Sequence, residues 1–317
     1  LEDAELSTRK AIQLNPKFAE AHSNLGNIFK EQGKLEEAEL STRKAIELNP
    51  EFADAYFNLS LIELLKGNYQ SGLENYQFRF KKLQPVIPDA NPNIQIVNHT
   101  QLQTEEKLLV ISEQGLGDTL QFMRYIPYLK SQGLNVSFCA KTKLHTLIKE
   151  SAIDQNPLTP EQANQVSDGQ WIPLLSLPRY LQVNPNNPIV TKPYIFSTDE
   201  LNKKWKSLLS KEKKPIIGIN WQGNPKLENT YQGRSIPLEI FSILTAQNDI
   251  KLLSLQKGFG SEQLNHCSFK NQFVECQPHI DSTWDFLENA AIIENCDCII
   301  TCDTSIAHLA GGMGKKV

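Results

Sequence analysis

The sequence predicts an all-α block of helical repeats followed by two α/β lobes, each built on a parallel sheet. Three observations predict this class. A segment of sixteen residues recurs almost unchanged after 34 positions, apolar runs of strand length alternate with amphipathic stretches of helix length, and glycine-rich or polar turns separate them. The chain has 317 residues, which is enough for about two or three domains.

The composition is that of an ordinary globular protein, with 40% hydrophobic and 21% charged residues. The net charge of −4 gives no reason to expect a nucleic-acid partner. No apolar run reaches the roughly 18–20 residues that span a membrane, and no signal peptide opens the chain. Cys296, Cys298 and Cys302 fall in an apolar run that predicts a buried strand, with no nearby His or Cys pair to complete a zinc site. Reduced thiols without a secretion signal predict a cytoplasmic protein.

The repeat at the start of the chain is the strongest signal in the sequence. Residues 1–16 and 35–50 are identical at fourteen of sixteen positions. Their offset of 34 is the period of tetratricopeptide repeats, in which each unit is a pair of antiparallel helices. Small residues such as Gly26 and Ala38 allow close helix packing, and Pro50 cannot continue a helix. The pattern predicts a repeat region over 1–84, with helices at 2–14, 19–32, 35–48, 53–66 and 69–82.

The end units of this repeat region differ from the regular pattern. In the third unit, Gly72 and Arg79 replace small alanines, as expected where the neighbour is not another repeat. The first unit lacks its first helix, and solenoids of this kind need about three repeats. We therefore expect further repeats upstream and a chain truncated at both ends. Tetratricopeptide arrays bind peptides or proteins or serve as spacers, so we expect a protein or peptide partner here.

The first α/β lobe is predicted over 107–195, after a proline- and asparagine-rich linker at 85–106. The runs KLLVIS and NVSFCA predict two strands, and the helix between them completes a βαβ unit. Its glycine loop stands at the first strand-to-helix turn, where Gly115 and Gly117 allow a ligand to approach the backbone. Asp118 follows them, and the residues alone leave open whether it is a helix cap or a general base.

The second lobe is predicted over 196–317, with a polar loop at 224–237 that ends near Arg234. Polar groups follow each of its three strands, at Asn220 and Gln222, at Gln256 and Lys257, and at Asp303, Thr304 and Ser305. Parallel strands present such ends at one edge of a sheet. The last of these groups begins a helix, whose free N–H groups favour phosphate, although helix capping alone also explains it. Arg234 and Lys257 would add positive charge for a diphosphate, and His308 lies one helical turn further on.

Several of these segments resemble a known family. DTSIAHLAGGMGKKV, at 303–317, resembles the donor-site segment of ADP-heptose:lipopolysaccharide heptosyltransferases. GINWQGNPK, RSIPL and LLSLQKG resemble the C-terminal lobe of bacterial tetratricopeptide-repeat proteins with a heptosyltransferase-like domain, of the glycosyltransferase family 9 type. EQGLGDTLQFMRYIPYL and PLLSLPRYL resemble the N-terminal lobe of the same proteins. The resemblance implies a GT-B fold, a pair of Rossmann-type lobes that hold the nucleotide-sugar donor mainly on the second lobe and the acceptor on the first.

The resemblance also implies roles for individual residues. Asp118 matches the catalytic base of heptosyltransferases, and Gly115 and Gly117 lie in the acceptor-side loop. The predicted donor-binding residues are Gln222, Arg234, Gln256, Lys257, Asp303, Thr304, Ser305 and His308. Enzymes of this type are expected to need no metal, so no cofactor is predicted beyond the nucleotide sugar. Arg234 stands where the family has a lysine, the first lobe is shorter than in a full heptosyltransferase, and the family continues past Val317, which leaves open whether this length of chain is active.

Two functions follow from these features. The first is an inverting, metal-independent glycosyltransferase of the hexosyl- or heptosyl-transferring type, which moves a sugar from a nucleotide sugar to a protein or glycan acceptor. The second is a non-catalytic scaffold, in which the repeats bind partners and the α/β part is a degenerate nucleotide-sugar module. The joint presence of Asp118, Arg234 and the 303–308 segment favours the enzyme. Repeats joined to a GT-B domain also resemble the O-GlcNAc transferases, which favours a protein acceptor.

Overall fold

The structure is a computed structural model that describes residues 1–97, 102–225, 233–246 and 249–317. It divides into two compact units. The repeat unit comprises Leu1–Pro88 and Leu175–Ile189, and the α/β unit comprises Asp89–Leu174 and Val190–Val317. The chain therefore passes between the units three times.

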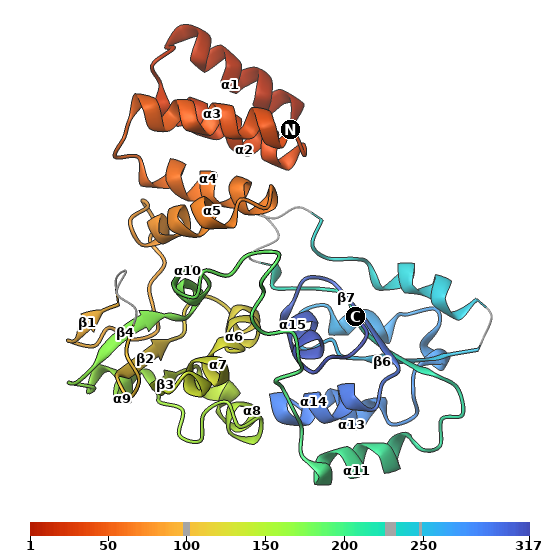
Figure 1. Cartoon of the computed structure of the whole chain (residues 1–317). Helices are drawn as coiled ribbons and strands as arrows, with labels where there is room; N and C mark the ends of the chain where they lie inside the picture. The colour runs from red at the N-terminus through yellow and green to blue at the C-terminus, as the bar shows by residue number, and fades with distance from the viewer. Residues whose placement is uncertain (98–101, 226–232, 247–248) are drawn as a thin grey trace. The chain divides into compact units, whose positions relative to one another are not determined.

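The repeat unit is a stack of antiparallel helices (Figure 1). Its elements are α1 (Glu2–Leu14), α2 (Ala19–Glu31), α3 (Leu35–Leu48), α4 (Ala53–Leu65), α5 (Tyr69–Asn75) and the 3-10 helix η1 (Tyr76–Phe80). The first four confirm the predicted helices to within one residue. The fifth differs, because α5 ends at Asn75 and the chain tightens into η1 instead of continuing to residue 82.

Small side chains set the spacing of α2 and α3. Ala38 and Ala45 are fully buried on α3, and Thr42, between them, donates its hydroxyl to the carbonyl of Ala38 at 2.8 Å. Gly26 of α2 faces this hydroxyl so closely that a Cβ atom there would lie 2.1 Å from Thr42 Oγ1. A glycine is therefore needed at this contact between the two helices, because a side chain there would force them apart.

Arg79 explains why the third unit departs from the pattern. Its side chain is fully buried, with the guanidinium 4.0 Å from the ring centroid of Phe80 and 4.6 Å from that of Tyr76. It donates a hydrogen bond of 2.8 Å to the hydroxyl of Ser176, which in turn donates to Gln77 at 2.8 Å. A long cation at the position of a small alanine is thus accommodated by a segment from much later in the chain.

That later segment belongs to a different unit from the one predicted for it. Residues 175–189, which were predicted to belong to the first α/β lobe, group with the repeats and contribute α10 (Leu177–Tyr180). Arg179 of α10 forms an ion pair of 2.7 Å with Glu74 of α5. The pattern could not show this return, because the partners are 105 residues apart.

The first sheet of the α/β unit has four parallel strands in the order β1-β4-β2-β3. They are β1 (Gln95–Ile96), β2 (Lys107–Ile111), β3 (Asn135–Cys139) and β4 (Gln170–Pro173). The helices are α6 (Leu116–Phe122), α7 (Tyr125–Ser131), α8 (His145–Glu150) and α9 (Pro160–Asn164). The predicted βαβ unit is present. The predicted linker at 85–106 differs, because β1 within it pairs with β4, and a strand of two residues is too short to give a periodic signal.

The second sheet has three parallel strands in the order β6-β5-β7. They are β5 (Ile216–Asn220), β6 (Lys251–Ser254) and β7 (Cys298–Thr301), so β5 is central. The helical elements are α11 (Asp199–Leu209), η4 (Leu238–Thr245), α13 (Gln277–Asp281), α14 (Phe286–Glu294) and α15 (Ser305–Gly312). Helix α14 begins at Phe286, because Asp285 caps it by accepting the N–H of Leu287 at 2.8 Å.

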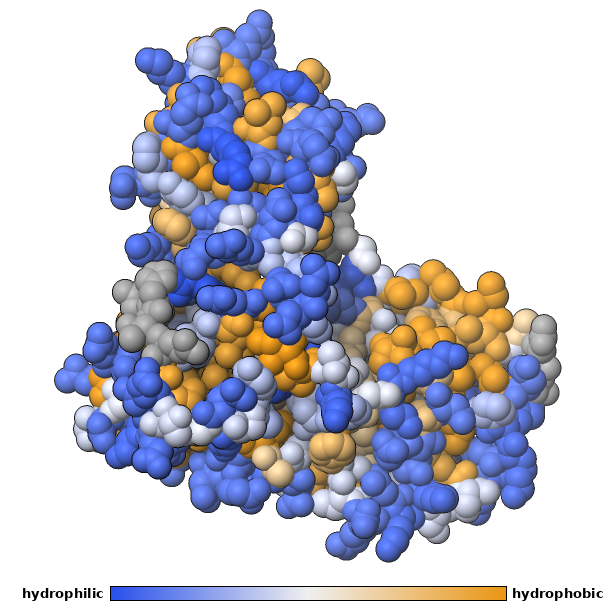
Figure 2. All heavy atoms as spheres, in the orientation of Figure 1, coloured by the Kyte–Doolittle hydropathy of each residue, from blue (hydrophilic) through white to orange (hydrophobic). Residues whose placement is uncertain are grey.

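The 3-10 helix η4 covers part of this sheet with one face only. Leu238 and Phe241 are buried in a core cluster with Trp221 of the β5 end, whereas Ile240 and Ile243 are exposed. Figure 2 shows the apolar surface that results around this segment, which Figure 1 draws in cyan. Within the described ranges, no helix combines the length and the apolar character that a membrane crossing requires.

Candidate functional site

The loop after β2 carries the predicted glycines. Gln114 has a left-handed backbone conformation with φ of 61°, and Gly115 caps α6. The carboxylate of Asp118 turns back toward this cap, and its Oδ2 accepts the N–H of Gly115 at 2.9 Å. Asp118 is therefore not the N-cap itself; Gly115 is the N-cap, and Asp118 is the third helical residue of a capping box. The carboxylate remains half-buried rather than enclosed, so a role as a base stays a prediction.

Gly117 brings the two lobes together within the α/β unit. A Cβ atom at this position would lie 2.9 Å from Cδ2 of His308 and 3.5 Å from Cα of Ser305, both on α15. The first turns of α6 and α15 therefore approach each other closely, and only glycine leaves room for the imidazole. A second link is Tyr194, whose N–H donates to the carbonyl of Gly312 on α15 at 2.9 Å and whose hydroxyl donates to the carbonyl of Leu120 on α6 at 2.8 Å.

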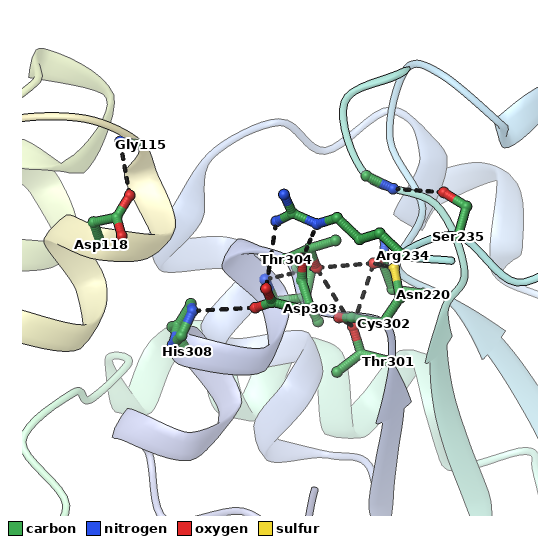
Figure 3. Close-up of polar contacts among 12 residues, drawn as sticks. Gly115, Asp118, Asn220, Arg234, Ser235, Thr301, Cys302, Asp303, Thr304 and His308 are labelled. Atoms are coloured by element: carbon green, nitrogen blue, oxygen red, sulfur yellow. Dashed lines mark hydrogen bonds and ion pairs between the residues drawn. The ribbon is translucent and has the colours of Figure 1, made fainter. Parts of the chain in front are cut away.

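Asn220, at the end of the central strand, joins the three strand ends. Its Oδ1 accepts the hydroxyl of Thr304 at 2.9 Å and that of Thr301 at 3.3 Å (Figure 3). Its Nδ2 donates to Gln256 at 2.9 Å. Thr304 is also the N-cap of α15 and accepts the N–H of Ile306. Asn220 was not among the predicted donor-binding residues, although a buried amide directly after an apolar strand is the signal that could have found it.

Arg234 and His308 converge on Asp303, directly before the cap of α15 (Figure 3). Nε of Arg234 donates to the carbonyl of Asp303, its Nη2 lies 4.0 Å from the Asp303 carboxylate, and Nε2 of His308 lies 3.6 Å from it. The Arg234 side chain is held over Gly223, where a Cβ atom would lie 3.2 Å from Nε. The structure thus brings together Arg234, His308 and the 303–305 segment, and their role in donor binding stays a prediction. Residues 226–232 of the predicted polar loop lie outside the described residues.

The electrostatic surroundings of His308 link it to both lobes. Burial lowers the pKa of His308 below its ordinary value of about 6.5, and the nearby carboxylates of Asp303 and Asp118 oppose this shift. The guanidinium groups of Arg124 and Arg234 add to the lowering. Arg124, which lies between α6 and α7, is a second cation beside the site that sequence reasoning missed, although it falls within the segment EQGLGDTLQFMRYIPYL.

Gln256 and Gln222 do not face this group. Gln256 is only 3% exposed, and its Oε1 accepts from the Asn220 amide and from the backbone N–H groups of Trp221 and Gln222. Its Nε2 donates to the carbonyls of Gln222 and Phe259. The Gln222 side chain accepts from Gln263 at 3.1 Å. The two glutamines fix the ends of β5 and β6, so their hydrogen-bonding groups are used inside the protein.

Lys257 also turns away from the N-terminus of α15. Its ammonium donates to the carbonyl of Ile280, beside α13, on the side of the sheet where β6 lies. Burial lowers the pKa of Lys257 to about 8, and the carboxylate of Asp281 only partly opposes this. A half-buried ammonium with a lowered pKa indicates that the charge is poorly compensated at neutral pH.

This lowered pKa predicts a pH-dependent stability. Lysine in an unfolded chain has a pKa of about 10.4, so between the pKa of about 8 in the folded protein and that value unfolding takes up a proton. The free energy of unfolding should therefore rise as the pH is raised through this window. We expect a smaller rise in Lys257→Met than in the unaltered chain, measured by urea unfolding at several pH values. The exposed Lys206, changed to Met, is the control, and parallel curves for the two variants would refute the prediction.

The repeats are confirmed by comparison with known families. Two tetratricopeptide-repeat families match the chain, at residues 19–52 and 42–74. No protein of curated function matches the chain in sequence. The family matches lie within the repeat unit, over the helices α2 to α5.

Solved structures of glycosyltransferases are similar to the chain in fold. A glycosyl transferase of family 9 from Veillonella parvula matches with a TM-score of 0.50 and 13% identity, over 69% of this chain and 81% of that one. The iron-containing dodecameric glycosyltransferase TibC from enterotoxigenic E. coli matches with 0.47 and 12%, over 68% and 58%. A mutant O-GlcNAc transferase from Thermobaculum terrenum matches with 0.32 and 12%, over 99% and 78%.

The comparison with TibC corrects the expectation about metals. Glycosyltransferases of this type were expected to need no metal, whereas TibC is described as iron-containing. In the part of the chain that the structure describes, no three His, Cys, Asp or Glu side chains form a group that could hold a metal ion. Because TibC is described as iron-containing, the expectation that enzymes of this type need no metal is wrong. What the comparisons establish is the architecture: tetratricopeptide repeats followed by parallel α/β sheets with a GT-B-like glycosyltransferase fold.

Proposed function

We propose that the α/β unit is an inverting glycosyltransferase, which moves a sugar from a nucleotide-sugar donor to a protein or glycan acceptor. One observation carries this proposal. The N-terminus of α15, the guanidinium of Arg234 and the loop that bears Asp118 meet around the contact between Gly117 and His308. The groups proposed to bind the donor and to activate the acceptor thus come from two lobes and lie near one another, which supports the proposal on a fold that glycosyltransferases use.

The donor diphosphate would bind at the start of α15. The first N–H groups of a helix lack backbone partners and carry the positive end of the helix dipole. Arg234 is held beside them by its bond to the carbonyl of Asp303. Two sources of positive potential therefore act on the bridging oxygen that gains charge as the nucleotide diphosphate leaves.

The acceptor hydroxyl would be activated by Asp118. In this step the carboxylate takes the hydroxyl proton, the oxygen bonds to the anomeric carbon of the sugar, and the bond to the diphosphate breaks. Attack from the face opposite the leaving group inverts that carbon. The bond from the Gly115 N–H to Oδ2 orients the carboxylate, and the second oxygen is the one that would receive the proton.

The repeats would bind the protein or peptide partner. A groove of about 430 Å³ lies among α1, α2 and α3. Its lining combines the aliphatic side chains of Ile12, Leu25 and Leu40 with the cationic Arg9 and Lys44. This lining suits a segment that presents an apolar side chain next to an acidic one.

Nucleotide binding tests the proposed function directly. We expect calorimetry of the full chain with ADP, UDP and GDP to show binding of one diphosphate, and Arg234→Ala to weaken it by about 10- to 100-fold through loss of a charge-assisted contact. Lys206→Ala, which removes an exposed cation on α11, should leave the affinity unchanged. If no nucleotide binds, the scaffold is the correct function, since Asp118 and Arg234 would then serve only their contacts within the protein.

A further inference from the structure

A polar cluster lies at the carboxyl edge of the first sheet and takes no part in the donor site. It consists of Asp89, Ser112 and Lys141, which come from three separate segments of the α/β unit. Asp89 falls within the predicted linker, Ser112 follows β2, and Lys141 follows β3. The cluster borders the loop at 113–117 that leads to Asp118.

Asp89 and Ser112 hold each other through two hydrogen bonds. The Ser112 hydroxyl donates to Oδ2 of Asp89 at 2.5 Å, and the N–H of Asp89 donates to the carbonyl of Ser112 at 2.9 Å. Ser112 is fully buried, and its own N–H donates to the carbonyl of Cys139, which extends the pairing of β2 with β3. The Asp89 carboxylate is thereby fixed relative to the first residue of the loop.

Lys141 joins this fixed carboxylate to the loop itself. Its ammonium lies 3.8 Å from Oδ1 of Asp89 and donates a hydrogen bond to the carbonyl of Gln114. Gln114 has the left-handed conformation that residues other than glycine rarely adopt, and such a conformation persists only where the surroundings hold it. The next residue, Gly115, supplies the N–H that binds Asp118.

We propose that Lys141 and Asp89 form a clamp that positions the Asp118 carboxylate, and this inference rests on the proposed function. The ammonium neutralises Asp89 and satisfies the Gln114 carbonyl, so it fixes the peptide group between Gln114 and Gly115, whose N–H binds Asp118. Without it, a carboxylate and a carbonyl oxygen face the same space with no cation between them, and the loop loses its fixed conformation. Lys141 and Asp89 are positioning residues, because they act through Gly115 and make no contact with the reacting atoms.

Hydrogen exchange of the loop tests the clamp without any substrate. In the full chain carrying Lys141→Met, we expect the backbone amides of 113–118 to exchange their hydrogens at least about fivefold faster than in the unaltered chain, because the loop opens locally. Lys141→Arg, which keeps the cation, should stay within about twofold of the unaltered chain. Lys143→Met, which removes an exposed cation two residues away, should leave the loop unchanged. Equal exchange rates in Lys141→Met and the unaltered chain would overturn the clamp.

Steady-state kinetics tests the positioning role. The substrate is a nucleotide sugar that contains whichever of ADP, UDP and GDP binds most tightly. Lys141→Met should lower kcat by about tenfold at an unchanged KM for the donor, with recovery in Lys141→Arg, because a displaced group acts only in the transition state. Faster exchange with an unchanged kcat would overturn the positioning role. If the unaltered chain binds no nucleotide, the proposed function fails, while the exchange experiment still decides whether the clamp exists.

Discussion

Replacing Asp118 with asparagine is expected to lower the turnover of sugar transfer by about 10²- to 10⁴-fold, the range that general-base catalysis contributes. Asparagine cannot take a proton from the acceptor hydroxyl. Its amide oxygen can still accept the N–H of Gly115, so the contact of 2.9 Å that begins α6 is kept. The affinity for the nucleotide diphosphate should therefore stay within about twofold, since the proposed donor-binding groups lie on the other lobe.

A second variant separates the two roles of this carboxylate. Asp118→Ala removes both the proposed base and the oxygen that accepts the N–H of Gly115, and loss of a capping bond typically lowers the free energy of unfolding by about 1 kcal/mol. Turnover should fall equally in the two variants, whereas only the alanine variant should lose stability in urea unfolding. If the asparagine variant keeps its turnover, Asp118 is a helix cap and the base is another group.

Gly26→Ala is expected to destabilise the repeat unit by about 3 kcal/mol, at the upper end of the range for overpacking. The new Cβ would lie 2.1 Å from Oγ1 of Thr42 and 3.0 Å from the carbonyl oxygen of Ala38. Thr42 cannot rotate away without breaking its own hydrogen bond, and the backbone oxygen cannot move without shifting α3. The gain in helix propensity, about 1 kcal/mol, is smaller than this steric cost.

A double variant shows whether the clash is the cause. Thr42→Ala removes the atom nearest to the new methyl group, so Gly26→Ala should cost less in its presence than alone, and a double-mutant cycle in urea unfolding measures the difference. Asn24→Ala, on an exposed position of the same helix, is the control and should change stability by less than about 0.5 kcal/mol. Additive effects of the two substitutions would contradict the steric account.

The repeats were predictable because the 34-residue period is a property of the sequence itself. The break from α5 to η1 was not, because it depends on the burial of Arg79 against Ser176, a contact between distant segments. The predicted linker at 85–106 wrongly included β1, and the cause is related. A strand of two residues has no period, and only its pairing with β4 identifies it.

The candidate site was predictable at the level of strand ends. The polar residues after β5, β6 and β7 do lie at one edge of a parallel sheet, but the sequence does not show which neighbours already use them. Gln256 is occupied by three N–H groups of the β5 end, and Lys257 by the carbonyl of Ile280. Asn220 was recognised as a strand-end group but not as a member of the site, and Arg124 was missed, because their importance arises from the neighbours that folding gives them.

The three passages of the chain between its units restrict how such a protein can change in evolution. Tetratricopeptide arrays lengthen and shorten by duplication or loss of whole units, because each unit contacts only its neighbours. Residues 1–16 and 35–50, with fourteen identical positions, have the form that such a duplication leaves behind. The unit that contains Arg79 is not free in this way, since its buried cation depends on Ser176, 97 residues later. We therefore expect natural variation in repeat number to be confined to the units before α4, and a transfer of residues 1–88 alone to another protein would leave that cation without its hydroxyl partner.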